Sequence, residues 1–140
     1  YFNRIIRFLK AYCQAYNVKA LVVGDFQKIK EGDVSRNFRQ IPHHLLRLKI
    51  RGFCEANGIR YIATEESFTS KRSAYTLEPL KYIPEGDCVR IERGLIHQSI
   101  AGKNIYFNAD INGACNIIRK VFDLKAESTK KVLKKPRILK

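Results

Sequence analysis

Two amphipathic segments, each followed by a short apolar run, most restrict the folds open to this chain. Over residues 1–17 the apolar side chains recur every three or four positions, which predicts a helix with one buried face. The run KALVVGD at 19–25 predicts a strand buried on both faces. A second helix is predicted at about 41–57, and a second strand, IRYIAT, at 59–64. This order predicts an α/β unit with right-handed connections and a parallel sheet.

Pro and Gly mark the limits of the second predicted helix. Pro42 suits the first turn of a helix, and Gly58 suits the left-handed position that follows one. The polar residues 26–40, which precede this helix, predict a loop.

Beyond the second strand the regular pattern stops. Residues 70–107 contain Pro, Gly and only short β-like pieces, so we interpret them as an insertion, with a hairpin as one form of it. A further helix is predicted at about 110–122. The Lys-rich segment 123–140 has little pattern and predicts a mobile basic tail.

The charge of the chain favours a polyanionic partner. Lys and Arg number 27 against 13 Asp and Glu, so the formal net charge is +14. Nucleic acid is the commonest polyanion, and an anionic membrane surface is the alternative. A membrane is the weaker expectation, because no apolar run approaches the ~20 residues of a membrane span.

Three of the four cysteines are expected to be buried. Cys13, Cys54 and Cys115 lie on apolar helical stripes, where a thiol behaves as a small hydrophobic group. None of the four, Cys88 included, belongs to a closely spaced pair, so no zinc site is predicted. A disulfide framework is not expected in a basic domain of cytosolic character. The chain has no Met and opens at Tyr1 within a predicted helix, so we expect it to be part of a longer protein.

Acidic residues stand where an α/β sheet would place a site. Glu65 and Glu66 follow the second strand, and ligands of open α/β sheets bind beyond the carboxyl ends of strands. Strand alternation sends the two side chains to opposite sides, so only one would face a site. Asp110 opens the later helix, and Asp25 ends the first strand next to Gly24, which suggests a tight backbone passage there. In so basic a chain, carboxylates of this kind suggest a divalent metal and phosphate.

Each of these features also has a purely structural interpretation. Asp110 could serve as the helix N-cap, and the two glutamates could be solvated. The segment SFTSK at 67–71 offers hydroxyls and a Lys that could hold phosphate or form turns. His43 and His44 are adjacent and do not share a helical face, so a two-His metal site is not expected; His97 is likewise not expected to bind metal.

Four segments resemble the C-terminal half of OrfB/TnpB proteins of insertion sequences. They are NFRQIPHHLL (37–46), GIRYIATEESFTSK (58–71), RGLI (93–96) and NADINGACNIIRK (108–120), in the order and spacing of that family. The resemblance covers roughly residues 1–122. It implies an RNA-guided DNA endonuclease of the prokaryotic cytoplasm and nucleoid, with a RuvC domain of the RNase H fold.

The resemblance implies roles for particular residues. Asp110 matches the family's last catalytic Asp. Gly24 stands where the family's second acid is usual, and relatives with this Gly carry a Glu before the TS motif, which corresponds to Glu66. Glu65 is the alternative to Glu66, and Asp25 is a further candidate that would be out of phase. Asp110 and Glu66 would therefore bind Mg²⁺ or Mn²⁺, and Lys71 and Arg93 would contact nucleic acid.

The chain also departs from the family pattern. The family's first catalytic Asp lies on an early strand that would precede Tyr1, so we expect an incomplete RuvC fold without its first strands, inactive alone. The paired zinc-ribbon cysteines are missing, so no zinc is expected and residues 70–107 would be held by their own packing. The expected partners are DNA and a guide RNA, with self-association through an exposed sheet edge as a further expectation. The alternative is a non-catalytic nucleic-acid-binding module or a degenerate transposon remnant.

Overall fold

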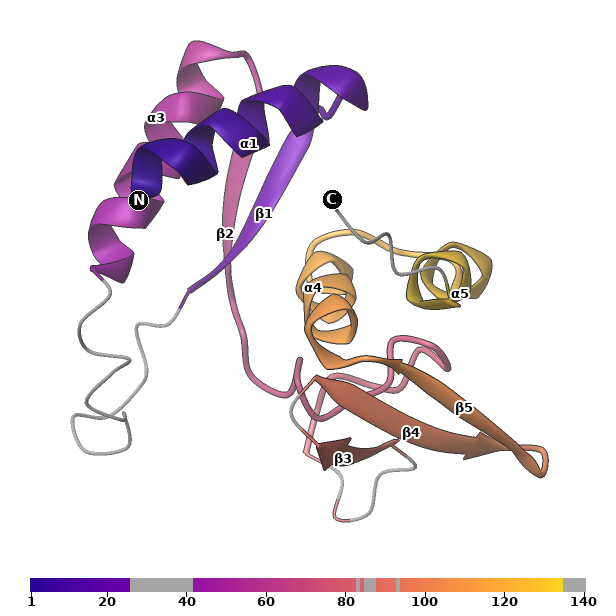
Figure 1. The fold of residues 1–140 in the computed structure, drawn as a ribbon. Coiled ribbons are helices and arrows are strands. Elements are labelled where there is room, and N and C mark those ends of the chain that lie inside the picture. The colour runs from indigo at the N-terminus through magenta and orange to yellow at the C-terminus, as the bar shows by residue number, and fades with distance from the viewer. Residues whose placement is uncertain (26–41, 83, 85–87, 93, 135–140) are drawn as a thin grey trace. The chain divides into compact units, whose positions relative to one another are not determined.

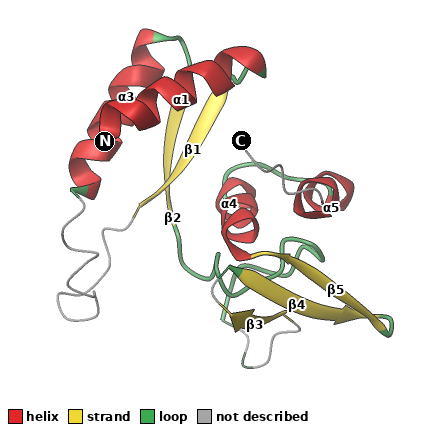
Figure 2. Ribbon diagram, in the orientation of Figure 1, coloured by secondary structure: helices red, strands yellow, loops and turns green. Residues whose placement is uncertain are grey.

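The computed structural model of this chain has a mixed α/β architecture (Figures 1 and 2). It describes residues 1–25, 42–82, 84, 88–92 and 94–134, with only the backbone at 88–90, 92 and 134. The chain divides into two compact units, Tyr1–Ala63 and Thr64–Lys140. The α/β class predicted from the sequence is therefore confirmed.

The first unit consists of two helices, each followed by a strand. In chain order these are α1 (Phe2–Ala15), β1 (Ala20–Asp25), α3 (His43–Ala56) and β2 (Arg60–Glu65), whose last two residues belong to the second unit. Strands β1 and β2 pair and run in the same direction (Figure 1). Their starting points are joined, since Arg60 N donates to Lys19 O at 3.0 Å. The predicted parallel pair is confirmed; the predicted loop 26–40 lies outside the described residues.

Both helices of this unit pass into their strands through the same backbone geometry. Gly58 has a φ of 65°, and Ile59 N donates to Cys54 O at 2.9 Å. At the end of α1, Asn17 has a φ of 50°, and Val18 N donates to Cys13 O at 2.9 Å. These are Schellman-type endings with Gly and Asn in the left-handed position. Gly58 thus has its predicted role, whereas Pro42 is the N-cap of α3 rather than a residue of its first turn.

A small apolar core joins the two helices of the first unit to the sheet. Its buried members are Cys13, Ile50, Phe53, Cys54 and Ile59. Cys13 is 4% exposed and Cys54 is 0% exposed, as the helical stripes predicted. Burial raises the pKa of both thiols, so each remains a neutral apolar group.

The second unit contains a three-stranded antiparallel sheet and two helices. The strands are β3 (Cys88–Glu92), β4 (Leu95–Ile100) and β5 (Lys103–Asn108), in that spatial order. Ala101 and Gly102 both have positive φ, 48° and 74°, as the two-residue turn between β4 and β5 requires. Helices α4 (Ala109–Arg119) and α5 (Ala126–Lys134) follow. The second half of the segment interpreted as an insertion therefore forms this sheet, which shares one unit with both helices.

Part of the basic C-terminal segment is helical and packed. Leu133 is 1% exposed and belongs to the core of the second unit, with Tyr75, Ile96 and Phe107. Thr129, one turn before it, is also 1% exposed. The prediction of a mobile tail is therefore wrong for residues 126–134. Two buried positions among several lysines are too few to show a clear period in the sequence.

Candidate carboxylate site of the second unit

Helix α4 begins with a side-chain cap that leaves the carboxylate of Asp110 unused. The N-cap is Asn108, whose Oδ1 accepts hydrogen bonds from Asp110 N at 2.8 Å and Ile111 N at 3.0 Å. The alternative interpretation of Asp110 as the N-cap is therefore wrong. Asp110 is exposed, and within the described part of the chain its carboxylate makes no hydrogen bond or ion pair.

The position of Asp110 has an electrostatic consequence. An acidic side chain in the first turn of a helix interacts favourably with the partial positive charge of that end. Asp110 thus stabilises α4, and it forms no ion pair with a Lys or Arg among the described residues. Its carboxylate stays open to a cation from solution.

Two buried asparagines of α4 hold the preceding loop in place. Asn112 and Asn116 are both 0% exposed. Asn112 accepts from Ala74 N and donates to Arg72 O, both at 2.8 Å. Asn116 donates to Thr69 O at 2.8 Å and to Arg72 O at 2.6 Å. The motif residues beside Asp110 therefore have a structural role.

A wider polar network continues from these asparagines. Arg119 donates to Asn116 Oδ1 at 2.7 Å and to Glu78 O at 2.9 Å. Ser73, which is fully buried, donates to Gln98 Oε1 at 2.6 Å, and its backbone N–H bonds Glu78 Oε2 at 2.9 Å. Helix α4, the loop after residue 69 and strand β4 are joined in this way. A signal was present in the sequence: Asn112 and Asn116 stand one helical turn apart, on the face that also carries Cys115.

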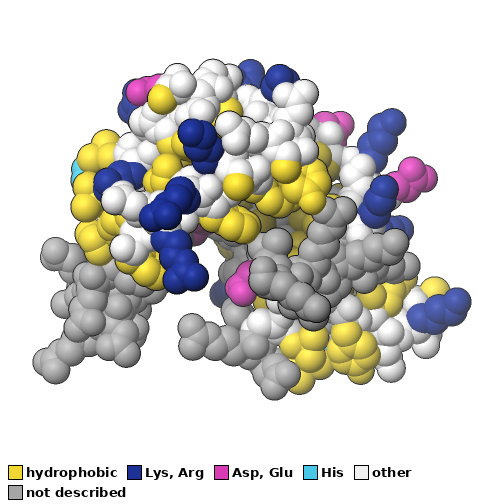
Figure 3. All heavy atoms as spheres, turned by 45° about the horizontal axis from the view of Figure 1, so that its top comes forward, with side chains coloured by type: hydrophobic (Ala, Val, Ile, Leu, Met, Phe, Trp, Pro, Cys, Tyr) yellow, Lys and Arg dark blue, Asp and Glu magenta, His cyan; other side chains and the backbone are white. Residues whose placement is uncertain are grey.

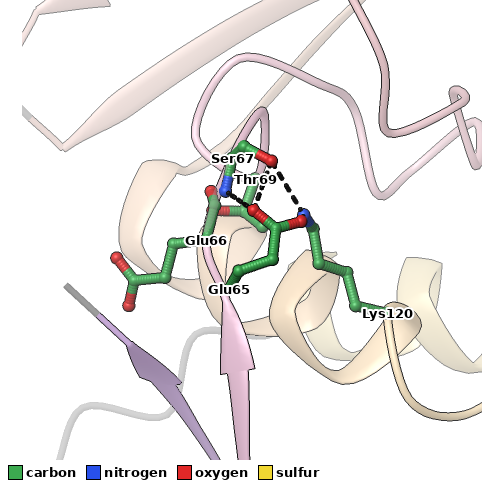
Figure 4. Close-up of polar contacts among 5 residues, drawn as sticks. All are labelled: Glu65, Glu66, Ser67, Thr69 and Lys120. Carbon is green, nitrogen blue, oxygen red and sulfur yellow. Dashed lines mark hydrogen bonds and ion pairs between the residues drawn. The ribbon is translucent and has the colours of Figure 1, made fainter. Parts of the chain in front are cut away.

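Glu65 takes part in a local ion pair (Figure 4). Its carboxylate contacts Lys120 Nζ and the Ser67 hydroxyl, and accepts from Ser67 N at 2.9 Å. The hydrogen bond from Lys120, with those from Ser67, lowers the pKa of Glu65 from 4.5 to about 2. Lys120 Nζ also lies 3.2 Å from Ser67 Oγ. Glu65 is therefore a partner of Lys120 rather than an open metal ligand.

Glu66 points away from this cluster. In Figure 4 its carboxylate lies on the opposite side of the chain from that of Glu65, as strand alternation predicted. Thr69 bonds back to Glu66 O through both its N–H, at 3.2 Å, and its hydroxyl, at 2.8 Å. This turn supports the structural interpretation of the SFTSK hydroxyls.

The contacts along α4 give the relative levels of the two candidate carboxylates. The Ser67 hydroxyl contacts Lys120, which follows the last residue of α4. The Thr69 carbonyl accepts a hydrogen bond from Asn116, in the second half of the helix. Asn116 is roughly 9 Å along the helix axis from Asp110, at about 1.5 Å per residue. The backbone of Glu66 therefore lies beside the second half of α4, whereas Asp110 is in its first turn. In the described part of the chain, no group of three or more His, Cys, Asp or Glu is arranged to hold a metal ion.

The remaining sequence candidates have different surroundings. Asp25 pairs with Arg47 of α3 in the first unit, and the two side chains are 24% and 23% exposed. Lys71 is exposed, and Arg93 lies outside the described residues. The ring of His97 contacts that of Tyr106, with centroids 5.0 Å apart, and its Nε2 is 3.0 Å from Asn104 Oδ1.

Comparisons with known proteins do not assign the chain to a family. No family model matches it, and no curated protein matches it. No described helix is long and apolar enough to span a bilayer. Function is therefore inferred from the residues themselves: an open carboxylate at a helix start, a second carboxylate turned away from its ion-paired neighbour, and a strongly basic chain.

Proposed function

We propose that this chain is the C-terminal part of a RuvC-like nuclease of the RNase H fold, an RNA-guided DNA endonuclease similar to the OrfB/TnpB proteins. The observation that carries the proposal is the capping of α4 by Asn108, which leaves Asp110 exposed and without a bond to any described residue. An Asp whose only role was to cap the helix would have bonded to the backbone itself. The motif resemblance assigns a catalytic role to that same residue.

The proposal assigns the second carboxylate to Glu66. Glu65 is the weaker choice, because its ion pair with Lys120 would have to break before it could bind a metal. Glu66 points the other way, so it could bind a metal without breaking an ion pair with Lys120 (Figure 4). Since the backbones of Glu66 and Asp110 lie at different levels of α4, a metal shared by the two carboxylates requires Glu66 to move toward the start of that helix.

The donor set fits a hard divalent cation. Carboxylate oxygens are the ligands that Mg²⁺ and Mn²⁺ prefer. Asp110, Glu66 and an acid from outside these residues would hold such ions, which would supply an activated water and stabilise the leaving oxygen of a phosphodiester. In the proposal, Lys71 contacts the phosphate backbone of the nucleic acid, and the net charge of +14 attracts it.

The test uses the protein extended by the upstream residues of its gene. We expect Mg²⁺-dependent DNA cleavage with the guide RNA, and a loss of more than about a hundredfold in Asp110→Asn and in Glu66→Gln, since even outer-shell changes at metal sites cost up to that factor. Glu127→Gln, at an exposed acid of α5, is the matched control and should cleave as the parent does.

Other outcomes would contradict the proposal. Undiminished cleavage by Asp110→Asn would show that Asp110 is not a catalytic residue. Nucleic-acid binding without cleavage by the extended protein would favour the second candidate, a non-catalytic binding module. The net charge of +14 favours that candidate specifically, because it supports binding without any metal.

A further inference from the structure

One side of α1 carries a row of exposed aromatic rings. Phe8, Tyr12 and Tyr16 follow one another at intervals of one helical turn and are 48%, 43% and 52% exposed. The ring centroids of Phe8 and Tyr12 are 6.1 Å apart, and those of Tyr12 and Tyr16 are 4.5 Å apart. Large apolar side chains that stay grouped in water, rather than scattered, mark an interaction surface.

This aromatic row is not part of the contact between α1 and α3. Lys49 of α3 donates to Asn3 Oδ1 at 3.3 Å, which identifies the side of α1 that faces α3. Tyr12 follows Asn3 by about two and a half turns, so it lies on the opposite side of the helix. The core residues Leu9 and Cys13 occupy the face between them. The three rings, each about half exposed, therefore lie outside the side that carries Asn3 and outside the core face.

One basic side chain of α1 lies beside the aromatic row. Arg4 is exposed and lies one turn before Phe8, whereas Arg7 and Lys10 lie one and two turns after Asn3, on the side that faces α3. The sequence of α1, FNRIIRFLKAYCQA, contains no acidic residue. Figure 3 shows Lys and Arg side chains beside hydrophobic ones on the face of the first unit turned to the viewer. This combination of charge and flat apolar rings suits a polyanion that also presents flat apolar faces.

We propose that this side of α1 binds single-stranded nucleic acid, with bases stacked on Phe8, Tyr12 and Tyr16 and a phosphate near Arg4. Unpaired bases offer their faces to aromatic side chains, whereas the bases of a duplex are already stacked on one another. A second copy of the chain is a poorer partner, because it would bring like charges together. The binding needs neither metal nor catalysis, so it stands independently of the proposed nuclease activity.

The test measures binding of the 140-residue chain to a fluorescein-labelled oligothymidylate by anisotropy, in EDTA. We expect the double variant Tyr12→Leu/Tyr16→Leu to bind about tenfold or more weakly, because stacking contributes that much per base. The variant Tyr12→Phe/Tyr16→Phe keeps the rings and should bind as the parent does. Tyr82→Leu, which removes a 74% exposed ring elsewhere, is the matched control and should change nothing.

Two results would overturn the inference. Unchanged affinity of the Leu variant, with loss only in Arg7→Gln/Lys10→Gln, would show binding by charge alone. A change in sedimentation rather than in DNA affinity would show that the rings join two copies of the chain. Circular dichroism and thermal unfolding of each variant establish that the fold is retained, and a duplex of the same sequence should compete poorly.

Discussion

At the scale of the residue, the three asparagines between residues 108 and 116 have different roles. Asn108 caps α4, while Asn112 and Asn116, both fully buried, hold backbone groups of residues 69–74. Their neighbour Asp110 is exposed and makes none of these contacts. The same few residues thus contain both the anchors of the loop and the carboxylate proposed for catalysis, and mutations distinguish the two roles.

Asn116→Ala is expected to destabilise the second unit by roughly 1–3 kcal/mol for each buried carbonyl that loses its partner. The Thr69 carbonyl would lose its Asn116 partner, whereas the Arg72 carbonyl would keep the bond from Asn112. Urea unfolding measures the change. Asn104→Ala, at an exposed position of β5, should stay within about 0.5 kcal/mol. Equal stabilities of the two variants would refute the anchoring role.

The ion pair of Glu65 predicts a pH dependence. Its pKa is lowered from 4.5 to about 2, so its contribution to stability is complete above 4.5 and is lost as pH falls toward about 2. Lys120→Met removes the part of this contribution that comes from Lys120 and leaves the part from Ser67. The difference in unfolding free energy between parent and variant should therefore shrink as the pH falls through that range. Thermal unfolding between pH 5 and about 2 tests this. A difference independent of pH would show that Lys120 stabilises by packing alone.

At the scale of the element, α5 shows how a weak pattern can still produce a packed helix. Leu133 and Thr129 are buried, and Lys130 Nζ lies 5.3 Å from the centroid of the Tyr75 ring. Helix α5 therefore combines buried side chains with lysines, one of which lies over the Tyr75 ring. By contrast α1 and α3 carry long apolar stripes, and for this reason their positions were predicted to within two residues.

Leu133→Ala is expected to cost about 2–5 kcal/mol of unfolding free energy, because it removes a large buried side chain from the core of the second unit. Lys131→Ala, at an exposed position of the same helix, should have little effect. Urea denaturation compares the two. If both variants unfolded at the parent's midpoint, residues 126–134 would be dispensable for the fold of that unit.

At the scale of the whole molecule, charge and division into units set the context for function. The +14 net charge acts on any polyanion at long range, whichever residues contact it. The carboxylate candidates Glu66 and Asp110 belong to the second unit, and the aromatic row of α1 belongs to the first. Binding and catalysis are therefore proposed for different units, and each can be removed by mutation without touching the other.

The sequence alone determined the α/β class, the positions of α1, α3, β1 and β2, the burial of three cysteines and the basic character of the chain. These depend on periods of two or 3.6 residues and on net charge, which are local or summed properties. Only the tertiary structure decided that Asn116 holds Arg72, that Glu65 pairs with Lys120 and that Leu133 enters a core. Those contacts join residues distant along the chain, and such pairings leave no periodic trace in the sequence.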